Sequence, residues 1–104
     1  MTSPLHNLEG LTVTKVVEIH DYVQLHFGDE IGLSIYNEMQ TSPRSTGVAK
    51  FVGKTVTAVN ESDDMIEIRF LDGSKVIVDM HRQAYRGPEA LELNRRGQPP
   101  VIWN

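Results

Sequence analysis

The sequence contains no cysteine, which excludes disulfide bonds, thiolate nucleophiles and metal sites built on cysteine. No apolar run approaches the roughly 18 residues needed to span a bilayer. The opening stretch MTSPLHNLEG also lacks the basic and apolar segments of a secretory signal. We therefore expect a cytoplasmic protein that is held together by its hydrophobic core alone.

Basic residues are scarce in the first part of the chain. Residues 1–40 contain a single basic residue, Lys15, and six acidic ones: Glu9, Glu18, Asp21, Asp29, Glu30 and Glu38. Nucleic-acid binding requires clustered lysine and arginine, so this imbalance argues against nucleic acid as a partner. An acidic surface can instead attract a basic protein, although ordinary solvated faces are the alternative explanation.

Motifs for catalysis and metal binding are also missing. The histidines, His6, His20, His26 and His81, have neither the i, i+2 spacing of a strand pair nor the i, i+4 spacing of a helical pair. The glycines are dispersed, no serine lies in a Gly-x-Ser-x-Gly turn, and turn chemistry explains the aspartates. We therefore predict no catalytic residue, no metal and no cofactor in a protein that is not an enzyme.

The composition is sufficient for one hydrophobic core. The chain has 104 residues, of which 39% are hydrophobic and 23% charged, as is ordinary for a globular protein. A chain of this length has no room for a second independent core. We therefore expect one domain that covers residues 1–104.

An internal repeat is the most informative feature. Aligned without gaps at an offset of 43 positions, residues 10–37 and 53–80 share nine identities. Unrelated stretches of this length would share roughly two. The identical pairs include Gly10 with Gly53, Thr12 with Thr55, Val13 with Val56 and Phe27 with Phe70. The sequence therefore predicts two copies of one supersecondary unit.

Both copies alternate hydrophobic and polar residues, which is typical of half-buried strands. The stretch Leu-Asp-Gly-Ser at 71–74 indicates a hairpin turn. The opening strand is irregular, because its valines are three residues apart and cannot both face one side of an unbroken strand. A bulge or a strand with two buried sides is expected there. The residues expected to be buried are Val23, Leu25, Phe27, Ile66, Ile68 and Phe70.

We predict a mainly β protein in which each copy is a three-stranded antiparallel meander. Two meanders can bury their apolar faces together in a small sandwich or barrel. Residues 38–52 are expected to be a connector with one helical turn, with a strand at 49–52 as the alternative. The extension at 81–104 is expected to form a hairpin, with a short helix at 88–93 as the alternative.

The outward side of the first copy is the candidate binding site. Tyrosine combines an apolar ring with a hydroxyl group and is favoured as an anchor at interfaces, while carboxylates can form a charged rim. The alternative is that the C-terminal extension covers the rings. The residues expected to bind a partner are Tyr22, His26, Asp29, Glu30, Tyr36 and Glu38.

The stretches DYVQLHFGDEIGLSIYN (21–37), FVGKTVTAV (51–59) and AYRGPEALEL with PPVIWN (84–104) resemble a group of small bacterial β-rich proteins associated with polymorphic toxin loci. Immunity proteins of the contact-dependent growth inhibition type are among the proteins associated with such loci. The resemblance implies a non-enzymatic inhibitor that binds a cognate toxin domain, for example a basic nuclease, and it implies no site residue. A β-sheet module that binds a ligand or forms homo-oligomers is the alternative. Neither nucleic acid nor a membrane is expected as a partner.

Overall fold

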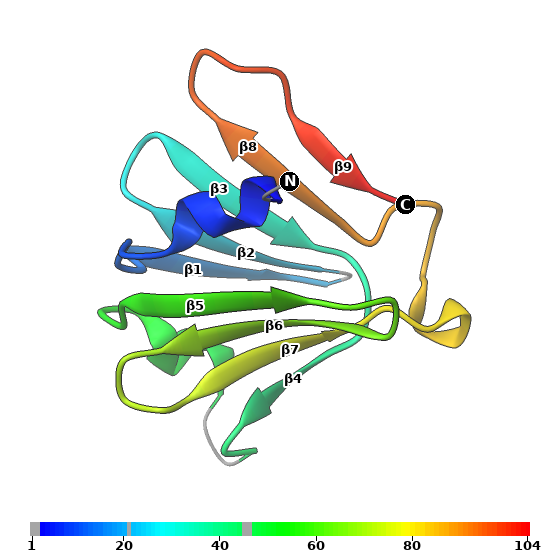
Figure 1. The fold of residues 1–104 in the computed structure, drawn as a ribbon, viewed down its shortest axis with the longest axis horizontal. Coiled ribbons are helices and arrows are strands. Elements are labelled where there is room, and N and C mark those ends of the chain that lie inside the picture. Colours follow the sequence, from blue (N-terminus) through cyan, green and yellow to red (C-terminus); the bar gives the residue numbers. More distant parts are fainter. Residues whose placement is uncertain (1–2, 21, 45–46) are drawn as a thin grey trace.

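The structure is a computed structural model that describes residues 3–20, 22–44 and 47–104. Asp21, one of the acidic residues in the first part of the chain, lies outside the described residues. Within them, nine strands form two antiparallel sheets (Figure 1). The prediction of a mainly β protein is therefore confirmed.

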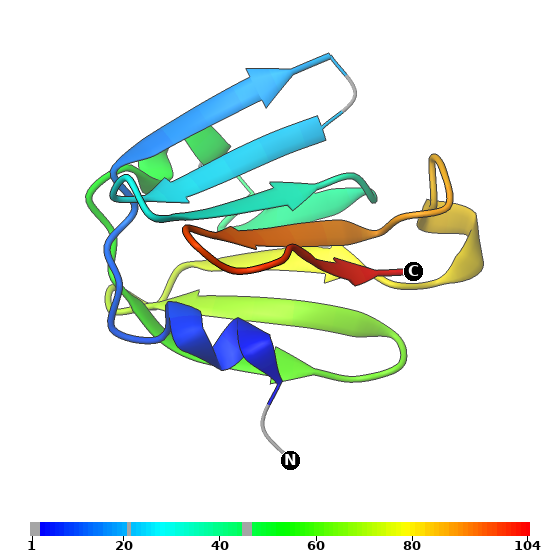
Figure 2. The ribbon, with the colours of Figure 1, turned by 90° about the horizontal axis from the view of Figure 1, so that it is seen from above.

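The two sheets have five and four strands. In spatial order the five-stranded sheet contains β1 (Lys15–Ile19), β2 (Tyr22–Phe27), β3 (Ile31–Ile35), β8 (Leu91–Arg95) and β9 (Val101–Trp103), side by side in Figure 2. The four-stranded sheet contains β4 (Met39–Ser42), β7 (Lys75–Asp79), β6 (Met65–Phe70) and β5 (Val56–Glu61). Three short 3₁₀ helices are η1 (Pro4–Leu8), η2 (Val48–Phe51) and η3 (Arg82–Ala84). None of the described helices has the length and hydrophobicity needed to cross a membrane.

Each of the two aligned stretches of the internal repeat supplies three consecutive strands to one sheet. Residues 10–37 contain β1, β2 and β3, and residues 53–80 contain β5, β6 and β7, with antiparallel neighbours throughout. The fourth strand of each sheet comes from elsewhere in the chain. β4 follows β3 but pairs with β7, whereas β8 follows β7 but pairs with β3. Each sheet is thus extended by a strand that follows the other sheet's meander.

The two segments outside the aligned runs differ in part from expectation. The predicted helical turn in residues 38–52 is η2, but the alternative strand at 49–52 is wrong, and β4 was not predicted. Its sequence, Met-Gln-Thr-Ser, carries no apolar alternation, and the strand is defined by its backbone pairing with β7. In the C-terminal extension β8 and β9 form the expected hairpin, and the alternative helix at 88–93 is wrong.

The segments that precede β1 and β5 are joined by a reciprocal set of hydrogen bonds. The amide of Gly10 donates to the carbonyl of Val56, and the amide of Gly53 donates to the carbonyl of Val13, both at 2.8 Å. Between these bonds the hydroxyl groups of Thr12 and Thr55 lie 2.7 Å apart. The threonines are 43 positions apart, which is the offset of the sequence alignment. Corresponding residues of the two runs therefore face each other where the sheets meet.

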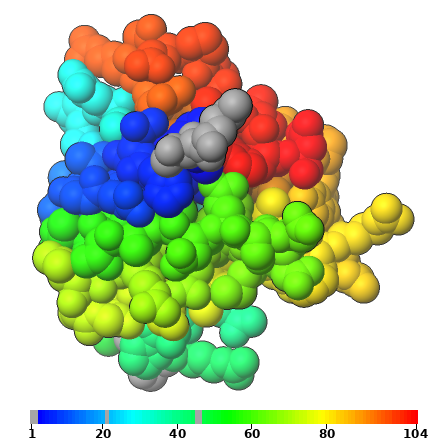
Figure 3. Space-filling model, viewed as in Figure 1, coloured from blue at the N-terminus to red at the C-terminus, as the bar shows by residue number. Residues whose placement is uncertain are grey.

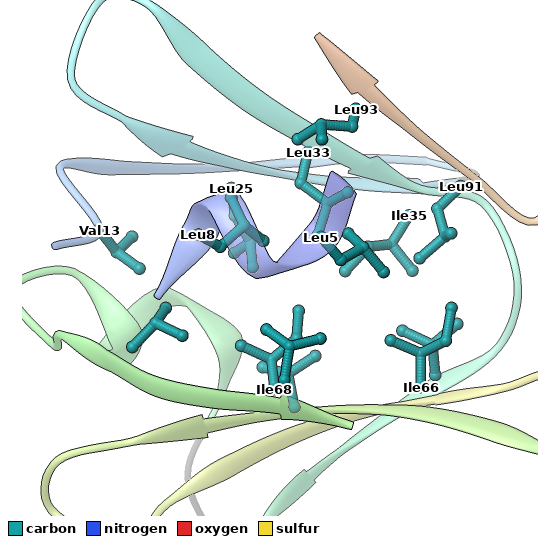
Figure 4. Packing of buried hydrophobic residues seen from close by; sticks show 14 of the residues in the cluster. Leu5, Leu8, Val13, Leu25, Leu33, Ile35, Ile66, Ile68, Leu91 and Leu93 are labelled. Atoms are coloured by element: carbon teal, nitrogen blue, oxygen red, sulfur yellow. The ribbon is translucent and has the colours of Figure 1, made fainter. Parts of the chain in front are cut away.

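The hydrophobic core lies between the two sheets (Figure 4). Side chains from β2, β3 and β8 face those from β6, and Leu5 and Leu8 of η1 contribute to the same cluster. In Figure 3 the N-terminal segment (blue) lies directly against the segment that contains β5 (green). Five of the six predicted core residues are buried: Leu25, Phe27, Ile66, Ile68 and Phe70. Val23 is only partly buried, which corrects the prediction.

The expected bulge is present in β5. The register with β6 shifts between Val56 and Ala58, so that Val56 and Val59 are both buried although they are three residues apart. In the first run Val13 is buried ahead of β1 and Val16 is partly buried within it. The extra residue of a bulge changes the side to which the following side chains point. Valines three residues apart can therefore face the same side.

The turn between β6 and β7 contains a carboxylate with several donors. Asp72 accepts hydrogen bonds from the ammonium group of Lys54, from the hydroxyl of Ser74 and from the Ser74 amide at 2.9 Å. These donors, Lys54 first and then Ser74, hold the pKa of Asp72 well below its usual range. A depressed pKa in the folded state stabilises the fold above the unfolded-state value of about 4, and this contribution is lost as the pH falls further.

We therefore expect Asp72→Asn to lower the free energy of unfolding at pH 7. The difference from wild type should shrink as the pH is lowered below about 4, because the wild-type carboxylate then becomes protonated as well. Urea unfolding at pH 7 and at several acidic pH values measures both effects. Asp63→Asn, in the exposed turn between β5 and β6, is the matched control. Equal effects of the two substitutions at pH 7 would contradict a stabilising role of the Asp72 contacts.

Candidate functional site

The strand register determines which side chains share the outward side of the five-stranded sheet. Ser34 on β3 lies opposite Gln24 on β2 and opposite Glu92 on β8. Residues directly opposite each other in an antiparallel pair point to the same side. By contrast, Leu33 lies opposite Leu25 and Leu93, and these three leucines face the core. We call the outward side of this sheet the outer face.

Two tyrosines are in contact on the outer face. The ring centroids of Tyr22 and Tyr36 lie 5.2 Å apart, with the rings tilted by 50°. Burial is the main cause that raises the pKa of Tyr36, followed by the negative charge of Glu92. The C-terminal hairpin extends the sheet beside β3 and does not form a layer over it. Both rings are accordingly half-buried and not fully covered.

Exposed aliphatic side chains flank the tyrosine pair. Ile19 on β1 lies opposite Tyr22 and is 42% exposed, and Ile102 on β9 lies opposite Glu92 and is 44% exposed. Both therefore point to the same side as the tyrosines. The outer face thus presents apolar surface near each of its lateral edges, on either side of its central strands.

A hollow of about 310 Å³ lies near one end of the outer face. We call it the His26 hollow; its lining includes Gln24, His26, Asp29, Glu30, Asn94, Arg95 and Arg96. The ring of His26 lies against Gly32, where a Cβ atom would be 3.7 Å from Nδ1. Among the described residues, the two carboxylates and two guanidinium groups of this hollow form no ion pairs, and Nε of Arg95 is buried without a hydrogen-bond partner. The charged groups of the His26 hollow therefore do not neutralise one another through ion pairs.

A second hollow, of about 530 Å³, lies beside Tyr36. We call it the Tyr36 hollow; its lining residues are Tyr36, Arg86, Gly87, Pro88, Glu89 and Glu92. Most of them belong to the connection from β7 to β8, part of which projects from the body of the molecule (Figure 3). Nδ2 of Asn94 donates to Oε2 of Glu92 at 2.9 Å, and this contact orients the carboxylate.

The residues predicted to bind a partner fall into three groups. Tyr22 and Tyr36 contact each other, and His26 lines the same hollow as Asp29 and Glu30. Glu38 is separate from both groups. Its amide donates to the carbonyl of Ala84, its carbonyl accepts from Asp79, and neither hollow includes it. Glu38 is thus exposed on the connection between β3 and β4, away from the lining of both hollows.

The sequence prediction missed the residues that the C-terminal part adds to this site. These are Arg86, Glu89, Glu92, Asn94, Arg95 and Arg96. The alternation of Glu92 and Asn94 with two leucines indicated an outward side. It did not indicate which strand β8 joins, and the pairing with β3 is what brings these side chains beside Tyr36 and His26.

The corresponding side of the four-stranded sheet differs in character. Glu67 on β6 is buried, because it lies on a central strand between β5 and β7. Its carboxylate contacts Arg69 at 2.6 Å and Lys75 at 3.6 Å. Those contacts, above all the one with Arg69, lower the pKa of Glu67 despite its burial. The charges on this side are therefore largely neutralised within the molecule.

The described residues contain no group of three or more histidine, aspartate and glutamate side chains that could hold a metal ion. The candidate site consists of the tyrosine pair and the two hollows of the outer face. Comparison with known proteins gives no match to a family model, to a curated protein or to a solved structure.

Proposed function

We propose that the protein is a non-enzymatic immunity protein that binds and neutralises a cognate toxin domain through its outer face. The observation that carries this proposal is the contact between Tyr22 and Tyr36, with the Tyr36 hollow beside it and the His26 hollow on the same face. The resemblance to proteins of polymorphic toxin loci supplies the kind of partner. The outer face supplies a reason why a protein surface would bind there.

The outer face combines apolar anchors with charged groups. Interface anchors are enriched in tyrosine, and the apolar surface of Ile19 and Ile102 enlarges the patch that a partner could bury. The unpaired charges of the His26 hollow favour a partner that brings charges of both signs. Such charges are costly to desolvate without a partner, so they also contribute to specificity.

The acidic first part of the chain favours a basic partner. Asp29 and Glu30 are exposed at the rim of the His26 hollow and form no ion pairs with its arginines. Exposed charges act mainly by accelerating the encounter with an oppositely charged protein. A basic toxin domain, such as a nuclease, has the complementary charge.

The decisive experiment is co-expression with the product of the gene immediately upstream. We expect the two proteins to co-purify and the cells to be protected from the toxin. A variant with both Tyr22→Ala and Tyr36→Ala should lose protection, whereas Met65→Ala on β6, in the other sheet, should retain it. Failure of the wild-type protein to bind or protect would contradict the proposal. Concentration-dependent self-association of wild type without such a partner would favour the homo-oligomeric module.

The double variant Asp29→Asn/Glu30→Gln should slow association with the toxin several-fold at low salt. Its rate should depend less steeply on ionic strength than that of wild type, because screening affects exposed charges most. Each carboxylate should contribute less than about 1 kcal/mol to affinity. Stopped-flow or surface-binding measurements at two salt concentrations test this, with Asp63→Asn/Asp64→Asn as a control that removes the same charge elsewhere. An association rate and salt dependence equal to those of wild type would exclude these residues from the rim.

We also propose that residues 10–37 and 53–80 are two copies of one unit, packed as a small sandwich about an approximate two-fold axis. The reciprocal hydrogen bonds around Thr12 and Thr55 support this arrangement. So do the three consecutive strands in each run. The copies share core and turn residues and differ on their outward sides, and we propose that the first copy contributes the tyrosines of the binding face.

A further inference from the structure

We propose that the Tyr36 hollow is a subsite for a basic side chain, and that arginine fits it better than lysine. A basic side chain is thus the chemical group that we expect the outer face to bind. The proposal rests on the proposed function, which says what kind of protein carries this side chain. Its basis is the combination, in one hollow, of a tyrosine ring, two carboxylates and a wall with little side-chain bulk.

The carboxylates give the hollow its preference for positive charge. Glu89 and Glu92 both line it, and both lie close enough to Tyr36 to disfavour ionisation of its phenol. Asn94 occupies only Oε2 of Glu92. Among the interactions of the described residues, none involves Oε1 of Glu92, so this oxygen is available to accept a hydrogen bond from a ligand.

The tyrosine pair provides a preoriented aromatic surface. Tyr36 is held on one side by Tyr22, at a centroid distance of 5.2 Å, and it is half-buried. A cation placed over the face of a tyrosine ring is attracted by the ring's quadrupole. A ring that is already held in place loses little conformational entropy on binding.

Shape distinguishes arginine from lysine. The hollow measures about 530 Å³, and its lining also contains Gly87 and Pro88, which add little bulk. A planar guanidinium can stack on the ring while it donates hydrogen bonds in the same plane to a carboxylate. An ammonium group is a compact point charge and cannot do both in this way.

Among the described residues that line the hollow, Arg86 is the one basic residue. It already interacts within the molecule. Its positive charge opposes the entry of a second cation. Removal of this charge should therefore strengthen binding of a basic side chain, which is the reverse of what an anion-binding hollow would show.

The test uses the whole protein, labelled with ¹⁵N, and small probes in place of the toxin. N-acetyl-arginine methylamide should cause saturable shifts of amide resonances around Tyr36, Glu89 and Glu92. The lysine analogue should bind several-fold more weakly, and the uncharged norleucine analogue should cause no shifts at these positions. Glu92→Gln, which preserves shape, should weaken arginine binding at least five-fold, and Arg86→Gln should strengthen it about three-fold. Glu61→Gln on β5 is the control and should change nothing.

Equal shifts with arginine and norleucine would overturn the inference, as would unchanged binding in Glu92→Gln. Tyr36→Phe should retain most of the affinity and Tyr36→Leu should lose it, since the ring and not the hydroxyl is required. Thermal melting of each variant checks that the fold is intact. Because the titration needs no toxin, its result is independent of protection in cells. Arginine binding without protection would contradict the immunity function alone, and protection without arginine binding would contradict the subsite alone.

Discussion

Phe70→Ala is expected to lower the free energy of unfolding by about 3 to 5 kcal/mol, because it leaves a cavity at a fully enclosed site. Phe70 on β6 is 2% exposed. Its ring meets that of Phe51 edge-on, with centroids 4.9 Å apart and planes at 68°. Phe51 belongs to η2, and Nζ of Lys54 lies 4.9 Å from its ring centroid. Loss of Phe70 therefore also removes a contact that holds the connector against the sheet.

Urea unfolding of the two proteins measures this effect. Leu71→Ala is the control, because the neighbouring Leu71 is 72% exposed and its truncation should change stability by no more than about 0.5 kcal/mol. A domain of ordinary stability has about 5 to 15 kcal/mol in total, so the alanine variant could be largely unfolded. In that case Phe70→Leu, which leaves a smaller cavity, should show an intermediate loss. A loss below about 1 kcal/mol for Phe70→Ala would contradict the packing described here.

Tyr36→Ala is expected to weaken toxin binding by about 2 kcal/mol or more, mainly through dissociation that is about 30-fold faster. Tyr36 lies between Tyr22 and the Tyr36 hollow, so its truncation removes both the ring contact and one wall of the hollow. Anchors at the centre of a desolvated patch govern dissociation, whereas rim charges govern association. The tyrosine variants and the Asp29/Glu30 variant should therefore change different rate constants.

Tyr22→Ala should also accelerate dissociation, and the double variant should lose less than the sum of the two single losses. The reason is that the rings contact each other, so removal of one already loosens the other. Met65→Ala serves as the control for truncation of an exposed side chain. If both single tyrosine variants dissociate at the wild-type rate and remain folded, the interface lies elsewhere on the molecule.

Short-range patterns in the sequence predicted most of the strands that form the two meanders. Alternation with a period of two reflects one buried and one exposed side, and it identified the buried positions of β2 and β6 apart from Val23. Val23 alternates correctly but is only partly buried, and it lies opposite Glu18 on the edge strand β1. Sequence alternation gives the side of a residue, and the position of its strand in the sheet sets how much of it is buried.

Long-range pairing accounts for what the sequence did not predict. Nothing in the residues of β4 or β8 indicates that they join the sheet of the other meander. The burial of Glu67 also depends on long-range pairing, because side chains of the neighbouring strands cover it. The sequence indicated the part of the candidate site that lies in the first copy, because Tyr22, His26 and Tyr36 lie on strands or turns with clear alternation. It did not indicate the part that lies in the C-terminal extension, because β8 reaches the site only by pairing with β3.

The crossing of β8 to β3 has a consequence for the order in which the molecule is completed during synthesis. β3 ends at Ile35, and its partner strand begins at Leu91. β1 and β3 can each pair with β2 soon after they are made, but the other edge of β3 stays open until residues 91–95 leave the ribosome. Pairing of segments so distant in the chain is slow compared with the closure of local hairpins. Glu92 of the Tyr36 hollow arrives with β8, so a nascent chain cannot present the complete outer face before β8 and β9 have been translated.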